Sequence, residues 1–133
     1  MPLAKLNHIE HDNLLRNGIP KPGGIWADLG SGTGAFTLAL AELLGPGAQI
    51  YSVDKKKGAL RRQGQEMGRR FPGTQLQTMT ADSTRPLDLP PLDGIVMANA
   101  LQFQRNKEAV LQLIHRYLKQ GGRRILVEYN IDR

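Results

Sequence analysis

The residues with the clearest chemical potential are three glycines at alternate positions, in the stretch DLGSGTG at 28–34. Gly30, Gly32 and Gly34 carry no side chain and tolerate positive φ, so the chain can turn sharply there and a ligand can approach bare backbone. An apolar run precedes the stretch and a helix-forming run follows it. The pattern predicts a strand-to-helix turn whose first helical amides face a ligand, although a purely structural turn has the same composition.

An acidic residue follows the glycines at the interval that nucleotide-binding folds use for ribose hydroxyls. Asp54 closes the second apolar run, 24 residues after Gly30, although it could serve only as a cap of the next helix. The sequence GSGTGA also satisfies a dinucleotide fingerprint. However, Asp28 lies two residues before the first glycine, where a carboxylate would repel a pyrophosphate and attract an amine. The loop therefore favours a nucleoside that carries an amino acid, and a dinucleotide stays as the alternative.

These stretches, together with YSVD at 51–54 and TAD at 80–82, resemble the class I S-adenosylmethionine-dependent methyltransferases. That family's motif D/E-x-G-x-G-x-G is matched in full from Asp28 to Gly34. By the resemblance, Asp28 and the glycine loop hold the methionine part of S-adenosyl-L-methionine, and Asp54 takes the two ribose hydroxyls. The cofactor-binding residues that the resemblance implies are Asp28, Gly30, Ser31, Gly32, Gly34, Asp54, Lys55, Asp82, Ser83 and Asn99.

The later positions of this set match the family less specifically. Asp82 would accept from the adenine amine with Ser83 beside the ring, although an aspartate before STRP could form only a local turn. Asn99, in the stretch ANAL at 98–101, would line the side of methyl transfer or be a plain loop residue. Lys55 stands where many relatives have an apolar residue against adenine, and its alkyl stem could pack there.

Short apolar strands alternate with helices, which is typical of a parallel sheet covered on both faces. Strands are predicted at 25–29, 49–54, 75–82, 94–99 and 123–130, and helices at 8–17, 35–44, 55–70 and 106–119. The resemblance implies a Rossmann-like, doubly wound, mainly parallel α/β sheet in the order 3-2-1-4-5, with helices on both faces, as one domain over 1–133. The family usually has two further strands, so we expect a truncated or minimal form whose fifth strand is an exposed edge, open to oligomerisation.

Several side chains outside the loop also carry expectations. The first helix would have Ile9, Leu14 and Leu15 on one side. His8 and His11 precede the fold proper and are expected to face solvent. The apolar positions of the helix at 106–119 indicate a broad buried face, closed by the glycines at 121–122. The chain has no cysteine, no cluster of metal-ligating residues stands out, and no metal site is expected.

The net charge of +6 is concentrated in one segment. Residues 55–70 hold seven lysines and arginines against the single Glu66. This predicts either a solvated helix face or a surface that attracts RNA, without base stacking because no aromatic residues interleave. No run of the sequence is long and apolar enough for a signal peptide or a membrane span, so a cytoplasmic protein without membrane contact is expected.

The resemblance implies methyl transfer by in-line displacement, in which orientation alone can supply roughly 7–11 kcal/mol. A general base is optional, and the sequence indicates no catalytic residue. The main hypothesis is a methyltransferase with a small-molecule acceptor. The alternatives are an RNA methyltransferase that uses the basic helix, a dinucleotide-binding domain, and a module that binds the cofactor without catalysis.

Overall fold

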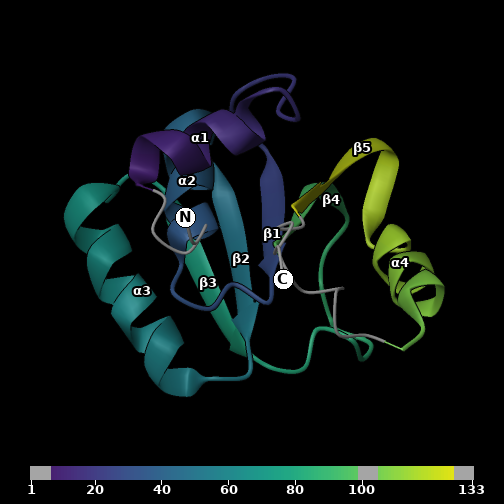
Figure 1. Ribbon diagram of the computed structural model, residues 1–133. Helices are drawn as coiled ribbons and strands as arrows, with labels where there is room; N and C mark the ends of the chain where they lie inside the picture. The colour runs from purple at the N-terminus through teal and green to yellow at the C-terminus, as the bar shows by residue number, and fades with distance from the viewer. Residues whose placement is uncertain (1–6, 99–104, 128–133) are drawn as a thin grey trace, which may run out of the picture.

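The computed structural model describes residues 7–98 and 105–127, and its strands form one sheet in the order β3-β2-β1-β4-β5 (Figure 1). All four neighbouring pairs run parallel, so the predicted order and direction are confirmed. The strands are β1 Ile25–Leu29, β2 Gln49–Asp54, β3 Gln75–Thr80, β4 Leu92–Ala98 and β5 Leu118–Val127. The helices are α1 His8–Arg16, α2 Ala35–Leu44, α3 Lys57–Arg70 and α4 Lys107–His115.

Helices cover both faces of the sheet, as expected. Helices α1, α2 and α3 lie on one side and α4 lies on the other (Figure 1). Successive strand residues point to opposite faces, so each inner strand contributes to two separate cores. The first core joins Trp26, Ile50 and Val96 to Leu40 and Leu44 of α2, and the second joins Leu29, Val53 and Ile95 to Val110 and Ile114 of α4.

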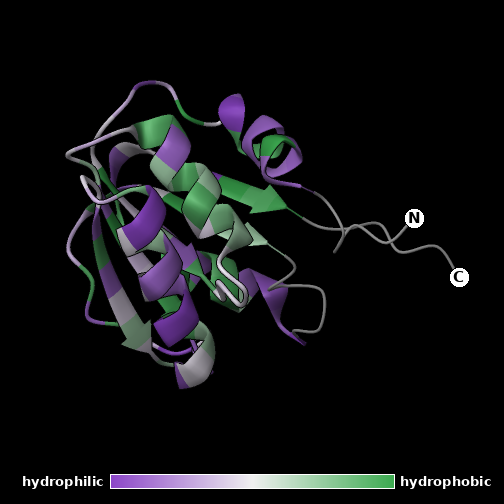
Figure 2. Cartoon of the chain, turned by 90° about the vertical axis from the view of Figure 1, so that its left-hand side faces the viewer, coloured by the Kyte–Doolittle hydropathy of each residue, from purple (hydrophilic) through white to green (hydrophobic). Residues whose placement is uncertain are grey.

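The helices on the α1–α3 side differ in polarity according to their position. Helix α2 is mostly apolar because it packs against the sheet and against α1, and α3 is mostly hydrophilic (Figure 2). All seven basic residues of the segment 55–70 are exposed. Among the described residues, no helix has both the length and the apolar character that crossing a bilayer requires.

Two predicted boundaries near the carboxyl end are wrong. Helix α4 ends at His115, whereas the prediction continued to 119, and β5 begins at Leu118, five residues before the predicted start. The glycines at 121–122 lie inside β5, in an irregular segment where the register against β4 shifts. Tyr117 and Leu118 continue the apolar pattern of the helix. In the structure Tyr117 directly precedes β5 and Leu118 begins it, and both pack against the second core. A local pattern could not separate these two arrangements.

The first helix forms where predicted, but it packs through a different face. Ile9 and Leu14 are 68% and 46% exposed, whereas Leu15 is buried together with His11 and Asp12. The expectation that His11 faces solvent is therefore wrong: its imidazole meets the ring of Phe36 on α2 edge-on, with 4.9 Å between the ring centroids. His8 is also partly covered, with its side chain 24% exposed. The orientation of α1 follows from its packing on α2. The sequence of α1 by itself does not show this packing.

Candidate functional site

The glycine loop connects β1 to α2 at the carboxyl end of the sheet. Gly30, Gly32 and Gly34 have φ values of 75°, 55° and 87°, a region that residues with a Cβ rarely adopt. Gly34 is also the N-cap of α2. The prediction of a strand-to-helix turn that requires glycine is confirmed at all three positions.

The loop is tied to the end of β2 by its own amides. Gly30 and Ser31 donate their N–H groups to the carbonyl oxygen of Val53, at 2.8 and 2.9 Å. Gly32 donates to Oδ1 of Asp54 at 3.0 Å. These three amides are engaged within the protein, whereas the amides of the first turn of α2 have no acceptor within the helix and can donate to a ligand.

Asp54 is at the tip of β2 and holds two backbone segments. Its Oδ1 accepts from Gly32, and its Oδ2 accepts from the N–H of Lys56 at 3.0 Å. The N-cap of α3 is Lys56, so the alternative that Asp54 is merely that cap is wrong. The carboxylate instead connects the glycine loop to the start of the basic segment.

A cavity of about 210 Å³ lies beside these strand ends, lined by Gly30, Asp54, Lys55, Lys56, Ala81, Asp82, Ser83 and Thr84. Five of the residues expected to bind the cofactor are thus brought together: Gly30, Asp54, Lys55, Asp82 and Ser83. A larger cavity of about 520 Å³ lies at the other end of the strands, near the start of β1. Ligands of open α/β sheets bind beyond the carboxyl ends of the strands, so we assign the site to the smaller cavity.

The sequence left two alternatives for Asp82, a local turn or a place in the site, and the structure shows both. Its Oδ1 accepts from the N–H and the hydroxyl of Thr84, at 2.9 and 2.6 Å. These hydrogen bonds stabilise the ionised form and hold the pKa of Asp82 below its usual value, with Lys55 contributing a smaller attraction. The Nζ of Lys55 lies 4.0 Å from Oδ2, and the Lys55 side chain is 74% exposed. Asp82 is therefore an anchored, ionised acceptor at the rim of the cavity.

Asp28 lies apart from this cavity, buried beneath the glycine loop on the side of α2. It is 1% exposed, and its Oδ2 accepts from the hydroxyl of Thr37 at 2.7 Å. Burial raises the pKa of Asp28 to about 7; the Thr37 hydrogen bond opposes this rise and the negative charge of Asp54 adds to it. The contact of Asp28 with a cofactor amine stays a prediction. Asn99 lies outside the described residues.

A buried polar cluster supports the loop from below, and sequence reasoning missed it. The hydroxyl of Ser31 lies 2.7 Å from the hydroxyl of Ser52 and accepts from Nε2 of Gln63 at 3.0 Å. The same Nε2 donates to the carbonyl oxygen of Gly32 at 2.7 Å. One signal was present in the sequence: Gln63 lies on the same face of α3 as the apolar residues Ala59, Leu60 and Met67, which are buried.

Comparisons with known proteins agree with this geometry. The family model described as "Methyltransferase domain" matches residues 27–124. A demethylmenaquinone methyltransferase from Symbiobacterium thermophilum is 32% identical over 114 residues, which cover 81% of this chain and 43% of the relative. A ubiquinone/menaquinone biosynthesis C-methyltransferase UbiE from Burkholderia mallei is 27% identical, covering 83% of this chain and 45% of the relative. The chain thus spans less than half the length of these curated relatives.

A solved methyltransferase structure has a similar fold. Coclaurine N-methyltransferase bound to N-methylheliamine and SAH superimposes with a TM-score of 0.80 and 22% identity, covering 90% of this chain and 35% of that one. The glycine loop, the acidic residue that ends β2 and the sheet order therefore have one explanation. The chain belongs to the class I S-adenosylmethionine-dependent methyltransferase family.

Proposed function

We propose that this chain is a methyltransferase that transfers a methyl group from S-adenosyl-L-methionine to a small-molecule acceptor. The observation that carries the proposal is the cavity at the strand ends, which presents the carboxylates of Asp54 and Asp82 beside Gly30. The names of the curated relatives, which refer to demethylmenaquinone and to ubiquinone and menaquinone biosynthesis, support the small-molecule class.

The residues at the cavity fit the nucleoside end of that cofactor. An ionised carboxylate has about four lone-pair positions. Asp54 uses two of its positions on Gly32 and Lys56, and Asp82 uses two on Thr84, so both keep capacity for ligand hydroxyl or amine donors. An acidic residue at the position of Asp54 also suits the ribose of a dinucleotide. Phosphate oxygens only accept hydrogen bonds, however, so the second carboxylate, Asp82, is a poorer match for a dinucleotide. The volume of about 210 Å³ is smaller than the roughly 300–1,000 Å³ of drug-sized pockets, and it suits one part of the cofactor.

When bound, S-adenosylmethionine supplies a methyl group already activated by a sulfonium. The work of the chain is then to bind and to orient. Asp54 would accept from the ribose hydroxyls while it holds the glycine loop through Gly32, and Asp82 would accept from the adenine amine. Orientation of this kind can lower a barrier by roughly 7–11 kcal/mol without a protein nucleophile.

Isothermal titration calorimetry with S-adenosylmethionine and S-adenosylhomocysteine tests cofactor binding by the intact protein. Asp82→Asn keeps the oxygen that accepts from Thr84 and removes the negative charge, so we expect a loss of affinity of about 10- to 100-fold. Asp54→Asn should lose at least as much, because it also weakens the loop. Asp88→Asn, an exposed carboxylate on the same connection, is the matched control and should bind like the wild type. No binding by the wild type, or equal binding by all three variants, contradicts the proposal.

The acceptor class is tested separately, with the same protein and with S-adenosylmethionine labelled in its methyl group. A demethylated menaquinone and an unmodified transfer RNA are offered in parallel, and label in each product is measured. We expect label in the quinone and none in the RNA. Label only in the RNA would replace the small-molecule acceptor by a nucleic acid while leaving the cofactor site unchanged.

A further inference from the structure

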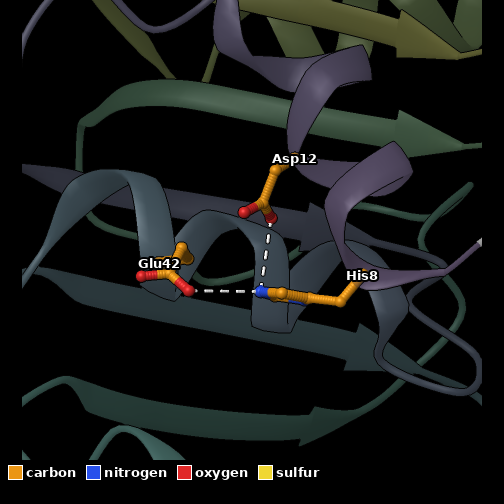
Figure 3. Close-up of side chains that lie close together, drawn as sticks. All are labelled: His8, Asp12 and Glu42. Carbon is orange, nitrogen blue, oxygen red and sulfur yellow. Dashed lines mark hydrogen bonds and ion pairs between the residues drawn. The ribbon is translucent and has the colours of Figure 1, made fainter.

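Three potential metal ligands meet between α1 and α2, on the outer side of α2. His8 and Asp12 are one helical turn apart on α1, and Glu42 projects from α2 (Figure 3). Nε2 of His8 lies 3.5 Å from Oδ1 of Asp12 and 3.4 Å from Oε1 of Glu42. One ligand atom from each residue can be chosen so that all three lie within 4.8 Å of one another.

Hydrogen bonding inside this group leaves one buried oxygen without a donor. A carboxylate only accepts, so the contact of His8 with Glu42 uses the single hydrogen on Nε2. The Asp12 side chain is 9% exposed, and its Oδ1 has no hydrogen-bond partner among residues 7–98 and 105–127. A buried carboxylate oxygen without a hydrogen-bond donor is costly, and a cation between the three side chains would satisfy it.

Two of the three separations between the ligand atoms match a small tetrahedral ion, and the third, between Asp12 and Glu42, is within 4.8 Å. Metal–ligand bonds of about 2.0–2.2 Å to imidazole nitrogen and carboxylate oxygen place neighbouring ligand atoms of a tetrahedron about 3.3–3.6 Å apart. The separations of 3.5 and 3.4 Å from Nε2 fall in this range. The Glu42 side chain is 51% exposed, so it can adjust to an ion that enters from solvent.

We propose that His8, Asp12 and Glu42 bind one Zn²⁺ ion, with water as the fourth ligand. A histidine with two carboxylates is a nitrogen and oxygen donor set that suits Zn²⁺, and Mg²⁺ or Ca²⁺ would prefer oxygen alone. The two carboxylates balance the charge of the ion. This site does not adjoin the cavity at the strand ends, and it is independent of the proposed methyl transfer.

The physical consequence of the ion is a link between α1 and α2. His8 and Asp12 are more than 25 positions away from Glu42 in the sequence, so the three ligands come together only in the folded protein. An ion that binds the folded state and not the unfolded one stabilises the fold by mass action. The expectation of no metal site rested on sequence spacing, which does not show that α1 packs on α2.

The test uses intact protein without a histidine tag, treated with a chelator and then dialysed. Calorimetry with zinc chloride, above the ordinary histidine pKa of about 6.5, gives stoichiometry and affinity. We expect one zinc ion per wild-type chain. His8→Ala and Glu42→Gln should each bind at least about tenfold more weakly, because even outer partners of metal ligands cost that much. His115→Ala removes an exposed histidine on α4 and is the matched control that keeps wild-type binding.

A second measurement separates a metal site from a simple ion pair. Without metal, Asp12→Asn should be at least as stable as the wild type in thermal unfolding, because it removes a buried carboxylate whose Oδ1 receives no hydrogen bond among the described residues. Zinc should raise the melting temperature of the wild type and of His115→Ala, and leave that of Asp12→Asn unchanged. Co²⁺ should give the intense visible absorption of a tetrahedral site in the wild type only. Zinc binding that Glu42→Gln and His8→Ala leave unaltered, or metal-free Asp12→Asn less stable than the wild type, overturns the proposal.

Discussion

Asp28, the first residue of the glycine motif, is buried, and burial changes its pKa. Its carboxylate is enclosed beneath the loop with the Thr37 hydroxyl as its hydrogen-bond donor. In the sheet it is paired with Ser52 of β2, whose hydroxyl lies 3.4 Å from the Thr37 hydroxyl. Asp28 therefore begins a chain of polar contacts under the loop, and removal of water raises its pKa to about 7.

This shift predicts a specific pH dependence of stability. Between the ordinary pKa of 3.8 and about 7, folded Asp28 keeps a proton that the unfolded chain has released. The free energy of unfolding should therefore fall as the pH rises through this window. Asp28→Asn keeps an acceptor for Thr37 and does not titrate. Relative to the wild type, it should gain stability from about pH 4 to about pH 7, by at most about 4 kcal/mol.

Urea unfolding at about pH 5 and about pH 8 measures the difference between the two proteins. Taking the difference removes the titration of all other groups, which both proteins share. Asp88→Asn, an exposed carboxylate, should follow the wild type at both pH values. Parallel pH profiles for wild type and Asp28→Asn would show that Asp28 is ionised in the folded protein throughout this range.

At the scale of the elements, α3 shapes the glycine loop through a side chain. Gln63 is 3% exposed and donates to both Ser31 and the carbonyl oxygen of Gly32, while Ser52 donates to its Oε1. The same side chain fills the space that a Cβ on Gly34 would need. Helix α3 therefore presents its basic residues to solvent and uses one amide to hold the loop in place.

Gln63→Ala tests this role. The substitution leaves several buried polar atoms without partners, at about 1–3 kcal/mol for each, so we expect a total destabilisation of about 2–4 kcal/mol. Affinity for S-adenosylhomocysteine should also fall, because the loop loses its support. Gln65→Ala removes an exposed amide from the same helix and should change stability by less than about 0.5 kcal/mol. Urea unfolding and calorimetry provide both readings, and similar results for the two variants would contradict the role of Gln63.

At the scale of the whole molecule, positive charge is gathered on the α3 side. All seven basic residues of the segment 55–70 are exposed, and Glu66 pairs with Arg69 and Arg70 at 2.6 and 3.7 Å. Lys55 and Lys56 also line the cavity at the strand ends. A predominantly positive surface beside a binding cavity can attract anionic ligands, and RNA binding there stays a prediction. Within residues 7–98 and 105–127, β5 is an edge strand beside β4, and oligomerisation through it likewise stays a prediction.

Paired substitutions separate the local surface from the net charge. Arg61→Gln with Arg62→Gln, and Arg123→Gln with Arg124→Gln, each remove two exposed positive charges. If the α3 surface attracts polyanions, the first pair should weaken binding of single-stranded RNA more, and lower the salt slope by about 0.7 for each arginine. Filter binding over a range of salt concentrations measures both quantities. Equal effects of the two pairs would show that only net charge matters and would remove the RNA hypothesis.

Features that depend on neighbouring residues could be predicted without the structure. The three glycines require a turn that other residues resist, and short apolar runs between helices require a covered parallel sheet. The interval from the loop to Asp54 placed an acid at the next strand end. Four features became visible only in the folded protein: the buried face of α1, the contact of Gln63 with the loop, the place of Asp28 beneath the loop and the start of β5 at Leu118. Each of these depends on a contact between segments distant in the chain, and local composition carries no information about such a contact.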